Sequence, residues 1–473
     1  MTRTPVVVKF GGAALADVEA VAGRLSTLRA GGRPVVAVVS AREGVTDRLL
    51  AAANGPSDSG AHRRALDDIR AAHPTGGPAL GRRLAELERA FAWCERRDRL
   101  DGAATDRILA FGERLAVDWL VPELRARGLP STGLDAAQIG MWTDGRHGAG
   151  TVLLDRSRRP VRHHVLGALA RGELPVVTGY FGRGTAGEPV TLGRGGSDYA
   201  ASALGVLVGA EFVELVKRHA SVLSADPAEV PAARPIRSLT YEEAEELAEF
   251  GARVLHPMTV EPARLAGIEL RIRSLGGAEE ETVVGSRGGP PGIRAVTASP
   301  PVALFRMRFP GARGRTGVLS EICRRLSSAG VPVLQVFTSA AVVSVVTAAN
   351  RSASARRVLR STVVERSARL EPTVSVSLIA GIGSGAIADL PRYPRSLLEG
   401  AEGISATRAS VTIAVPAHRR LAELRRLHRA VIERGTPRSR APTAGRRAFP
   451  PPAGRPARAP PPPRTRRKAP RTS

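Results

Sequence analysis

Cysteine is nearly absent from this 473-residue sequence, and the two residues present, Cys94 and Cys323, are too few for a disulfide framework and too far apart for a metal-binding motif. Aromatic residues make up only 4%, which leaves few side chains to stack against single-stranded bases. No apolar run approaches the length of a membrane span, and the N-terminus lacks a signal-peptide pattern. We expect a soluble, cytoplasmic protein of two or three domains with no membrane partner.

Lysine is also scarce, because only Lys9, Lys217 and Lys468 occur among 70 basic residues. A retained lysine is expected where a compact ammonium group is needed, although chance explains Lys468 well enough. The net charge is +26, of which residues 436–473 supply eleven basic side chains and no acid, leaving 26 − 11 = +15 for the rest. The remaining arginines are scattered among acids, so no specific nucleic-acid partner is expected.

Strand-like and helix-like patterns alternate along residues 1–285. The strands expected near the N-terminus are 6–8 and 34–41, and the helices that follow are 17–29, 80–97 and 105–128. The continuous apolar run of the second strand is typical of a buried parallel strand. The fold class is therefore α/β, with a mixed or largely parallel sheet between helix layers.

The C-terminal half divides into three further parts. Residues 286–301 have the composition of a linker, and residues 302–435 contain two successive small α/β units, the second one degenerate. Residues 436–473 contain eleven prolines and are expected to form a disordered tail, because they offer too little apolar surface to bury.

One glycine-rich motif is misleading. GRGTAG at 182–187 matches the dinucleotide fingerprint, but a strand-like segment follows it where a helix would be required, so we expect a hairpin. GRGGSD at 193–198 instead precedes an alanine-rich helix. Ser197 and Asp198 could simply cap that helix, but three glycines around Arg194 favour an anion site made of backbone amides and a guanidinium.

Two further loops follow strands in the same way, at 9–14 and 40–47. Gly11-Gly12 is compatible with an ordinary turn or with a phosphate cradle that includes Lys9. Because the ends of parallel strands meet at one edge of a sheet, we expect these loops and 193–198 to lie together. Glu113 has two interpretations, a site residue or a surface side chain paired with a neighbouring arginine.

Six separated motifs then occur in one order between residues 5 and 275: VVVKFGG, VVAVVSAREGVTDRLL, FGERLA, VVTGYFGRGTAGEPVTLGRGGSDYAA, LSADP and YEEAEELAEFGARVLHPMTVEPA. Together they resemble aspartate kinase, of the amino-acid kinase superfamily, and the duplicated unit resembles that family's tandem ACT domains. The resemblance implies an amino-acid kinase-type sandwich (1–285) followed by βαββαβ-like ACT domains. It implies ATP- and Mg²⁺-dependent phosphorylation of the L-aspartate side chain to 4-phospho-L-aspartate, the first step of lysine, threonine and methionine synthesis.

The resemblance also implies roles for single residues. Lys9 and Asp198 are the expected catalytic residues, Lys9 by neutralising phosphate charge and Asp198 by orienting Lys9. The expected nucleotide-binding residues are Lys9, Gly11, Gly12, Ser40, Gly195, Gly196, Lys217, Arg218, Asp226 and Arg253. The expected aspartate-binding residues are Thr46, Glu113, Arg194 and Ser197. No protein ligand for a metal ion is predicted.

The sequence departs from the family pattern on the nucleotide side. Ala13-Ala14 replace a pair of hydroxyl residues, the basic segment 216–221 replaces W-T-D-V-D-G, and Ala228 replaces an arginine. Either Lys217 and Arg218 grip the ATP phosphates directly, or nucleotide affinity is eroded and the protein is a weak enzyme or an amino-acid sensor. A kinase acting on glutamate or a carbamate is a further alternative. Feedback by lysine or threonine at the ACT domains, and a homodimer or larger homo-oligomer, are expected from the resemblance.

Overall fold

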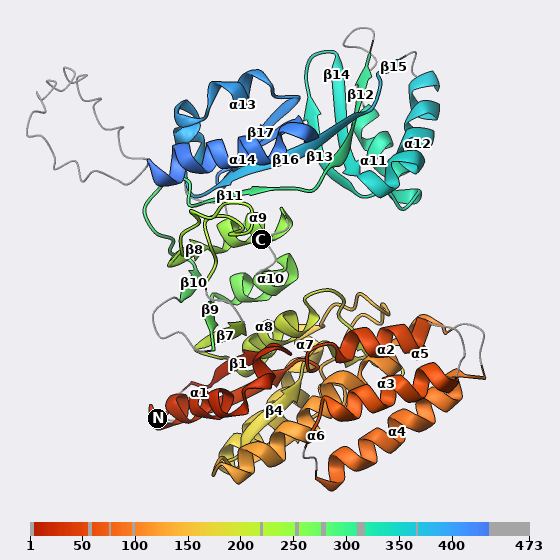
Figure 1. The fold of residues 1–473 in the computed structure, drawn as a ribbon, viewed down its shortest axis with the longest axis vertical. Coiled ribbons are helices and arrows are strands. Elements are labelled where there is room, and N and C mark those ends of the chain that lie inside the picture. Colours follow the sequence, from red (N-terminus) through yellow and green to blue (C-terminus); the bar gives the residue numbers. More distant parts are fainter. Residues whose placement is uncertain are drawn as a thin grey trace, which may run out of the picture. The chain divides into compact units, whose positions relative to one another are not determined.

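The computed structural model describes residues 4–54, 59–74, 77–96, 100–217, 221–250, 255–275, 281–309, 317–365 and 368–434, whose helices and strands are drawn in Figure 1. The expected tail, 436–473, and the predicted site residues Arg218 and Arg253 lie outside the described residues. Within the described part, no helix combines the length and apolar character that a membrane crossing requires.

The larger sheet is built by the first part of the chain. Its strands are, in spatial order, β3 (Ser131–Leu134), β4 (Leu174–Thr178), β2 (Val35–Val39), β1 (Val6–Phe10), β7 (Phe212–Lys217), β9 (Glu269–Ser274), β10 (Thr282–Gly285) and β8 (Ser238–Thr240). The strands from β3 to β9 run parallel, whereas β10 is antiparallel to β9 and parallel to β8. The prediction of a largely parallel central sheet is confirmed.

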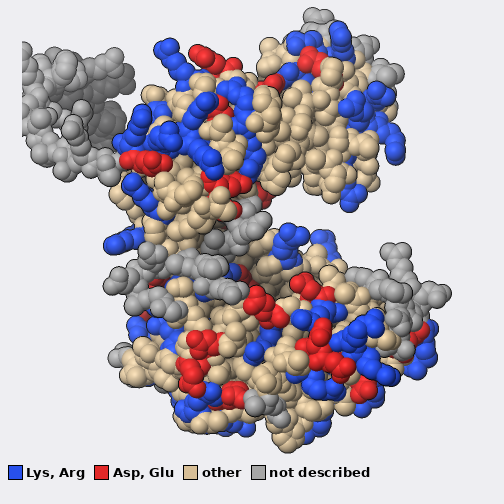
Figure 2. Space-filling model, in the orientation of Figure 1, with Lys and Arg blue, Asp and Glu red and all other residues tan. Residues whose placement is uncertain are grey.

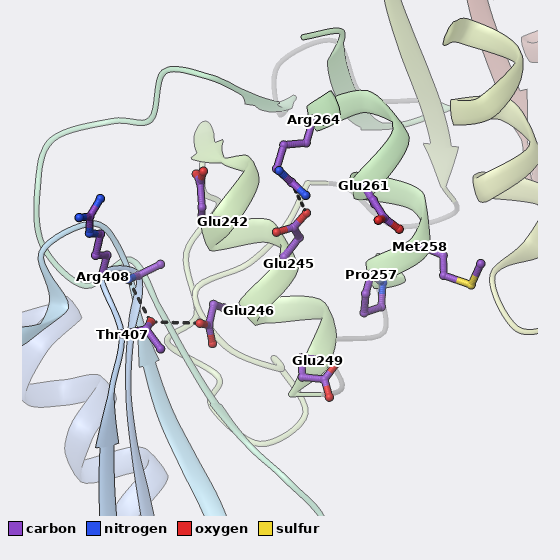
Figure 3. A pocket seen from close by; sticks show the side chains of 11 residues that line it. Glu242, Glu245, Glu246, Glu249, Pro257, Met258, Glu261, Arg264, Thr407 and Arg408 are labelled. Atoms are coloured by element: carbon purple, nitrogen blue, oxygen red, sulfur yellow. Dashed lines mark hydrogen bonds and ion pairs between the residues drawn. The ribbon is translucent and has the colours of Figure 1, made fainter. Parts of the chain in front are cut away.

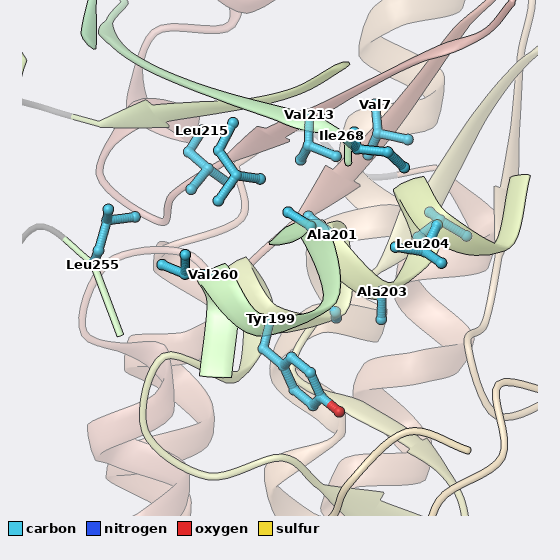
Figure 4. Close-up of a cluster of buried hydrophobic side chains, with 14 of the residues drawn as sticks. Val7, Tyr199, Ala201, Ala203, Leu204, Val213, Leu215, Leu255, Val260 and Ile268 are labelled. Carbon is cyan, nitrogen blue, oxygen red and sulfur yellow. The ribbon is translucent and has the colours of Figure 1, made fainter. Parts of the chain in front are cut away.

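Helices cover both faces of this sheet. One layer contains α1 (Val18–Ala30), α2 (Val45–Asn54), α3 (Ser59–Ala71), α4 (Pro78–Cys94), α5 (Gly102–Leu109) and α6 (Phe111–Ala126). The other contains α7 (Leu154–Ala170), α8 (Gly196–Val208), α9 (Tyr241–Glu249) and α10 (Pro257–Ala266). Successive side chains of β1 enter opposite cores, Val7 one and Val8 the other, which explains the uninterrupted apolar run. Figure 4 shows the core around α8, where Val7, Val213 and Leu215 pack near Ala201 and Leu204.

The helical character expected over 105–128 is confirmed up to residue 126, but it is not one continuous helix. The chain forms α5 and α6 instead, with Ala110 as the boundary between them. Both segments carry apolar residues at helical spacing, so periodicity alone does not reveal the break. The break matters for the site because it places Glu113 in the first turn of a new helix.

The predicted hairpin at GRGTAG is confirmed. β5 (Phe181–Arg183) and β6 (Pro189–Thr191) pair antiparallel across the glycine-rich turn. The motif therefore lies between two strands and is not the strand-to-helix turn that a dinucleotide fingerprint requires.

A second sheet is formed by the C-terminal part of the described chain. Its strands are, in order, β13 (Val333–Thr338), β14 (Val342–Ala348), β12 (Val302–Arg308), β16 (Val374–Ile382), β18 (Ser410–Pro416) and β17 (Gly403–Ala406), with β15 (Arg369–Leu370) beside β12. Its helices are α11 (Val318–Ser328), α12 (Ser352–Glu365), α13 (Arg395–Glu399) and α14 (Arg420–His428). All the pairings in this sheet are antiparallel, as expected for two adjoining ACT units.

The interpretation of 286–301 as a linker is wrong for its last part. Residues 295–298 form β11 (Ala295–Ala298), which pairs antiparallel with β16. Val296 is fully buried in the core below α14. The proline- and glycine-rich composition of 286–292 hid this strand, because the apolar run that follows is short. The second small unit thus includes a strand that precedes the first unit in the chain.

The acidic helix α9 contacts the second sheet. Glu246 accepts hydrogen bonds from the hydroxyls of Thr407 (3.0 Å) and Ser410 (2.9 Å), and Glu243 accepts one from the hydroxyl of Ser384 (2.8 Å). A cavity of about 580 Å³ lies between α9, α10 and the turn before β18, and Figure 3 shows its lining. On the face drawn in Figure 2, basic side chains are interspersed with acidic ones.

Candidate active site

Two lysines and one carboxylate meet at the ends of β1 and β7. Lys9 is 5% exposed, and its Nζ lies 2.8 Å from Oδ1 of Asp198, in the first turn of α8. Lys217, the last residue of β7, forms an ion pair with the other oxygen of the same carboxylate. The three side chains converge because β1 and β7 are parallel neighbours whose C-terminal ends lie at one sheet edge.

The charges of this cluster control one another. Burial lowers the pKa of Lys9, while the adjacent Asp198 carboxylate acts in the opposite direction. Burial also disfavours the ionised form of Asp198, but Lys9 and Lys217 outweigh it and lower the pKa of Asp198 to about 2. Two lysine side chains therefore share one carboxylate.

The loops after β1 and β2 lie against each other at Gly12. A Cβ atom on Gly12 would lie 2.3 Å from the carbonyl oxygen of Ala41, so only glycine fits at this crossing. The Ser40 amide donates to the carbonyl of Phe10 (3.2 Å), and the Gly11 amide to that of Val216 (3.4 Å). The predicted convergence of these two loops is confirmed.

The GRGG turn leads directly into α8. Gly195, the residue before the helix, has a left-handed φ of 73° and provides no side-chain cap. The alternative that Asp198 caps the helix is therefore wrong, because its carboxylate is engaged by the two lysines. Uncapped amides at a helix start favour an anion, and here they lie next to the lysine cluster.

Glu113 is a second buried carboxylate, 2% exposed. Its Oε1 accepts a hydrogen bond from the Ala41 amide (2.9 Å), whereas its Oε2 is buried without a hydrogen-bond partner among the described residues. Burial raises the pKa of Glu113 to about 8, against the opposing effects of the Ala41 amide, Lys9 and the Ser197 hydroxyl. The surface interpretation is wrong, since Arg114 pairs with Asp135 (2.6 Å) instead.

The other predicted substrate residues lie in α2, in the GRGG turn and in the first turn of α8. Ser197 is buried, and it packs closely on Gly179: a Cβ atom added to Gly179 would lie 2.9 Å from the Cβ of Ser197. Thr46 is half-buried in the first turn of α2, the helix that begins after the loop at Ala41. Arg194 is exposed between two left-handed glycines, and its guanidinium makes no ion pair with any residue in the described part of the chain.

Asp226 is not brought into this cluster by any described contact. Its carboxylate accepts a hydrogen bond from the Ala228 amide (2.9 Å) within a turn. The preceding Ser224 accepts from the Val296 amide (2.7 Å) and contacts His428, so this segment lies against the second sheet. Across the described ranges, no group of three or more His, Cys, Asp or Glu side chains is arranged to hold a metal ion.

Sequence reasoning missed two residues near the site. Tyr180 is the one non-glycine residue with a positive φ (66°) in the described part of the chain, and its ring contacts the start of α8 at Gly196. Burial, together with the charges of Glu113 and Asp106, raises the pKa of Tyr180 to about 12. A tyrosine between glycines in TGYFG is a weak signal of this backbone strain. Asp106 is buried in α5, and an aspartate within an apolar helical pattern could have indicated it.

Comparisons with known proteins define the class. The model of the amino acid kinase family matches residues 4–274, and the chain belongs to that family. An aspartokinase of Thermus thermophilus is 28% identical over 448 residues, which is 90% of this chain and 98% of the relative. The crystal structure of E. coli aspartokinase III in complex with aspartate and ADP matches with a TM-score of 0.74 and 25% identity, covering 90% of this chain and 99% of the other. The same enzyme in complex with lysine and aspartate matches with a TM-score of 0.69, 25% identity and the same coverage.

Proposed function

We propose that the protein is an aspartate kinase, which transfers the γ-phosphoryl group of ATP to the side-chain carboxylate of L-aspartate. The observation that carries the proposal is the pair of buried carboxylates: Asp198 forms ion pairs with two lysines, whereas Glu113 forms no ion pair among the described residues and one of its oxygens has no hydrogen-bond partner there. The first arrangement suits a triphosphate and the second suits an ammonium group. Relatives named aspartokinases, one of them solved with aspartate and ADP, support the same assignment.

Lys9 and Lys217 form the phosphate side of the site. Asp198 keeps both ammonium groups in place and offsets part of their repulsion, so little reorganisation is needed when phosphate arrives. The amides of Gly11 and Gly12, the loop at Ser40, and the start of α8 at Gly195 and Gly196 add hydrogen-bond donors around the same point. Arg218, Asp226 and Arg253 stay predictions for the nucleotide.

Glu113 and Arg194 form the aspartate side. The free Oε2 of Glu113 accepts a hydrogen bond from the α-ammonium group, which also compensates its buried charge. Arg194, whose guanidinium is exposed, pairs with the α-carboxylate in a bidentate manner. Thr46 and Ser197 donate hydroxyl hydrogen bonds to the substrate. Holding both α-substituents leaves the side-chain carboxylate directed towards the lysines.

In the chemical step, a side-chain oxygen of aspartate attacks the γ-phosphorus while the bond to the β-phosphate oxygen breaks. The products are 4-phospho-L-aspartate and ADP, and no proton is gained or lost at the reacting oxygens. Lys9 stabilises the charge on the transferring group, and Lys217 the charge that develops on the leaving phosphate. No protein ligand for Mg²⁺ is proposed; an Mg²⁺ ion that accompanied ATP would supply additional neutralisation of phosphate charge beside Lys9 and Lys217.

The C-terminal units supply regulation in this proposal. Residues 1–285 form the catalytic domain, and residues 302–435, together with β11, form the tandem ACT domains. Lysine or threonine is the proposed effector, in keeping with a structure of E. coli aspartokinase III that contains lysine. The product feeds lysine, threonine and methionine synthesis in the cytoplasm, and the protein acts as a homodimer or larger homo-oligomer.

The test is a coupled assay of aspartyl hydroxamate. Purified protein with ATP, Mg²⁺, L-aspartate and hydroxylamine should give hydroxamate, and replacing aspartate with glutamate or carbamate should give none. A calorimetric titration with ATP in the same preparation distinguishes an aspartate kinase, which binds ATP, from an amino-acid sensor, which does not. Aspartate binding without ATP binding and without hydroxamate would identify an amino-acid sensor, and this outcome would overturn the proposal.

A further inference from the structure

Asp106 is a buried carboxylate that the phosphoryl-transfer step does not use. It lies in α5 and is 1% exposed. Its Oδ2 accepts hydrogen bonds from Nδ1 of His147 (2.7 Å), the Gly148 amide (3.2 Å) and the Thr191 amide (3.1 Å), and its Oδ1 accepts one from the Thr191 hydroxyl. Four donors from two separate segments therefore converge on one side chain.

The first segment held by Asp106 touches the GRGG turn. The backbone at Gly148 packs on Gly193, where a Cβ atom would lie only 2.9 Å from the Gly148 carbonyl oxygen. Gly193 itself has a left-handed φ of 74°. The turn at 147–149 therefore forms one wall against the residue immediately before Arg194.

The second segment is the strand that leads into the same turn. Thr191 is the last residue of β6, and both its amide and its hydroxyl donate to Asp106. The Gly150 amide also donates to the Thr191 carbonyl (2.9 Å), which ties the two segments to each other. On the far side of Arg194, a Cβ atom on Gly195 would lie 2.7 Å from the Cβ of His256.

The backbone of Arg194 is thus fixed from both sides, while its side chain is exposed. We propose that Asp106 is a positioning residue for substrate specificity: through Gly148 and Thr191 it fixes the backbone from which Arg194 reaches the α-carboxylate of the amino-acid substrate. This inference deepens the proposed function and rests on it. A buried carboxylate is suited to the task because each lost acceptor would leave a buried donor unsatisfied.

The experiment uses Asp106→Asn in the full-length protein. The neutral amide is a weaker acceptor than the carboxylate, and its NH2 group faces donors that the carboxylate accepted from, so the two segments should shift with respect to each other. We expect KM for aspartate to rise about 10- to 100-fold, because small displacements of a positioning group have effects of this size. KM for ATP should change less than about threefold, since the lysine cluster does not contact Asp106.

A second substrate distinguishes positioning from general loss of structure. The α-carboxamide of aspartate lacks the negative group that Arg194 recognises, so the ratio of kcat/KM for aspartate to that for the amide reports on this contact. We expect Asp106→Asn to lower the ratio about tenfold or more. In an Arg194→Ala background the same change should lower it less than about twofold, because the two residues act as one unit.

Two further variants keep the result interpretable. Asp101→Ala removes the N-terminal cap of the same helix, where Asp101 accepts a hydrogen bond from the Ala104 amide (2.7 Å), and it should leave the ratio unchanged. Thr191→Val removes a single donor and should lower the ratio by about twofold to fivefold, even if Asp106→Asn fails to fold. An unchanged ratio in both Asp106→Asn and Thr191→Val, with an active wild-type enzyme, would overturn the inference alone. A wild-type protein without activity would instead overturn the proposed function.

Discussion

The two buried carboxylates of the site, Asp198 and Glu113, respond to burial in opposite ways. Asp198 has two lysine partners, and its pKa falls to about 2. Glu113 has one amide donor and one unpartnered oxygen, and its pKa rises to about 8. The two groups belong to the same site and are almost equally inaccessible, so the difference comes from their partners.

This difference separates two forms of preorganisation. The half around Asp198 holds its charges in a neutralising arrangement before any ligand arrives, so it can accept phosphate with little movement. The half around Glu113 has no cationic partner for this carboxylate, and the α-ammonium group of aspartate supplies one when the substrate binds. The lowered pKa of Asp198 stabilises the fold at neutral pH, whereas the lowered pKa of Lys9 and the raised pKa of Glu113 cost stability, the latter until aspartate binds.

Replacing Lys9 should have the largest effect. In Lys9→Met the side chain keeps its length but loses its charge, and Asp198 keeps Lys217 as a partner, so the fold should persist. We expect kcat to fall about 10³-fold, a size typical of removing a group that stabilises transition-state charge. The hydroxamate assay measures the loss, and circular dichroism checks the fold.

Lys468→Met is the matched control for loss of one lysine, and it should keep wild-type kcat. Near-normal turnover by Lys9→Met would show that Lys9 has no part in the mechanism. The proposed phosphate-binding role of the Asp198, Lys9 and Lys217 cluster would then be wrong.

Replacing Glu113 should weaken aspartate binding and at the same time stabilise the fold. In Glu113→Gln the amide oxygen still accepts from the Ala41 amide, but no charge remains for the substrate ammonium group. KM for aspartate should rise about 100-fold, as expected for losing a buried charged hydrogen bond. The variant should also be the more stable protein at pH 8.

The sign of this stability difference follows from the pKa of Glu113, which folding raises from 4.5 to about 8. The folded wild-type binds the proton more tightly than the unfolded chain, so the wild-type loses stability as pH rises between these values, by about 3–5 kcal/mol in total. Chemical denaturation of both proteins at pH 5 and pH 8 measures it. Equal pH dependence in the two proteins would show that Glu113 is ionised in the free enzyme.

Aspartate binding should depend on pH for the same reason. Since the ammonium group requires an ionised Glu113, the apparent affinity should weaken about tenfold for each pH unit below 8 and become constant above 8. Calorimetry at pH 7 in buffers of different ionisation enthalpy should detect release of nearly one proton. The pH profile of Glu113→Gln serves as the reference and should be flat across this range.

Replacing Lys217 should have the smallest effect of the series. In Lys217→Met, Lys9 keeps its position against Asp198, so chemistry continues with one cation fewer. KM for ATP should rise about tenfold with little change in KM for aspartate. A larger loss in kcat than in Lys9→Met would reverse the roles of the two lysines.

Much of the fold follows from local patterns. The strand at Val6–Val8, the helix after Asp17 and the hairpin at GRGTAG are set by periodicity and turn chemistry, which a sequence displays directly. The break between α5 and α6 and the strand β11 were missed, because each depends on packing against residues far away in the chain.

The sequence indicated which residues belong to the candidate site better than it indicated how they contact one another. The motifs identified Lys9 and Asp198, and the departure from the family pattern at 216–221 identified Lys217. That both lysines pair with the Asp198 carboxylate depends on β7 lying beside β1. The raised pKa of Glu113 likewise depends on burial in the folded chain, which no residue spacing encodes. The predicted roles of Arg218 and Arg253 stay predictions, since both lie outside the described residues.

The pairing of β11 with β16 has a consequence for how the chain assembles. Ala295 lies opposite Ile382, and the whole first small unit is made between them. β11 is synthesised before β16, and the residues that form the first small unit lie between these two strands in the chain. A chain stopped after residue 370 would expose the edge of β11 and invite aggregation. The C-terminal part of the described chain is therefore one nested assembly, and its two units cannot be separated by a single cut.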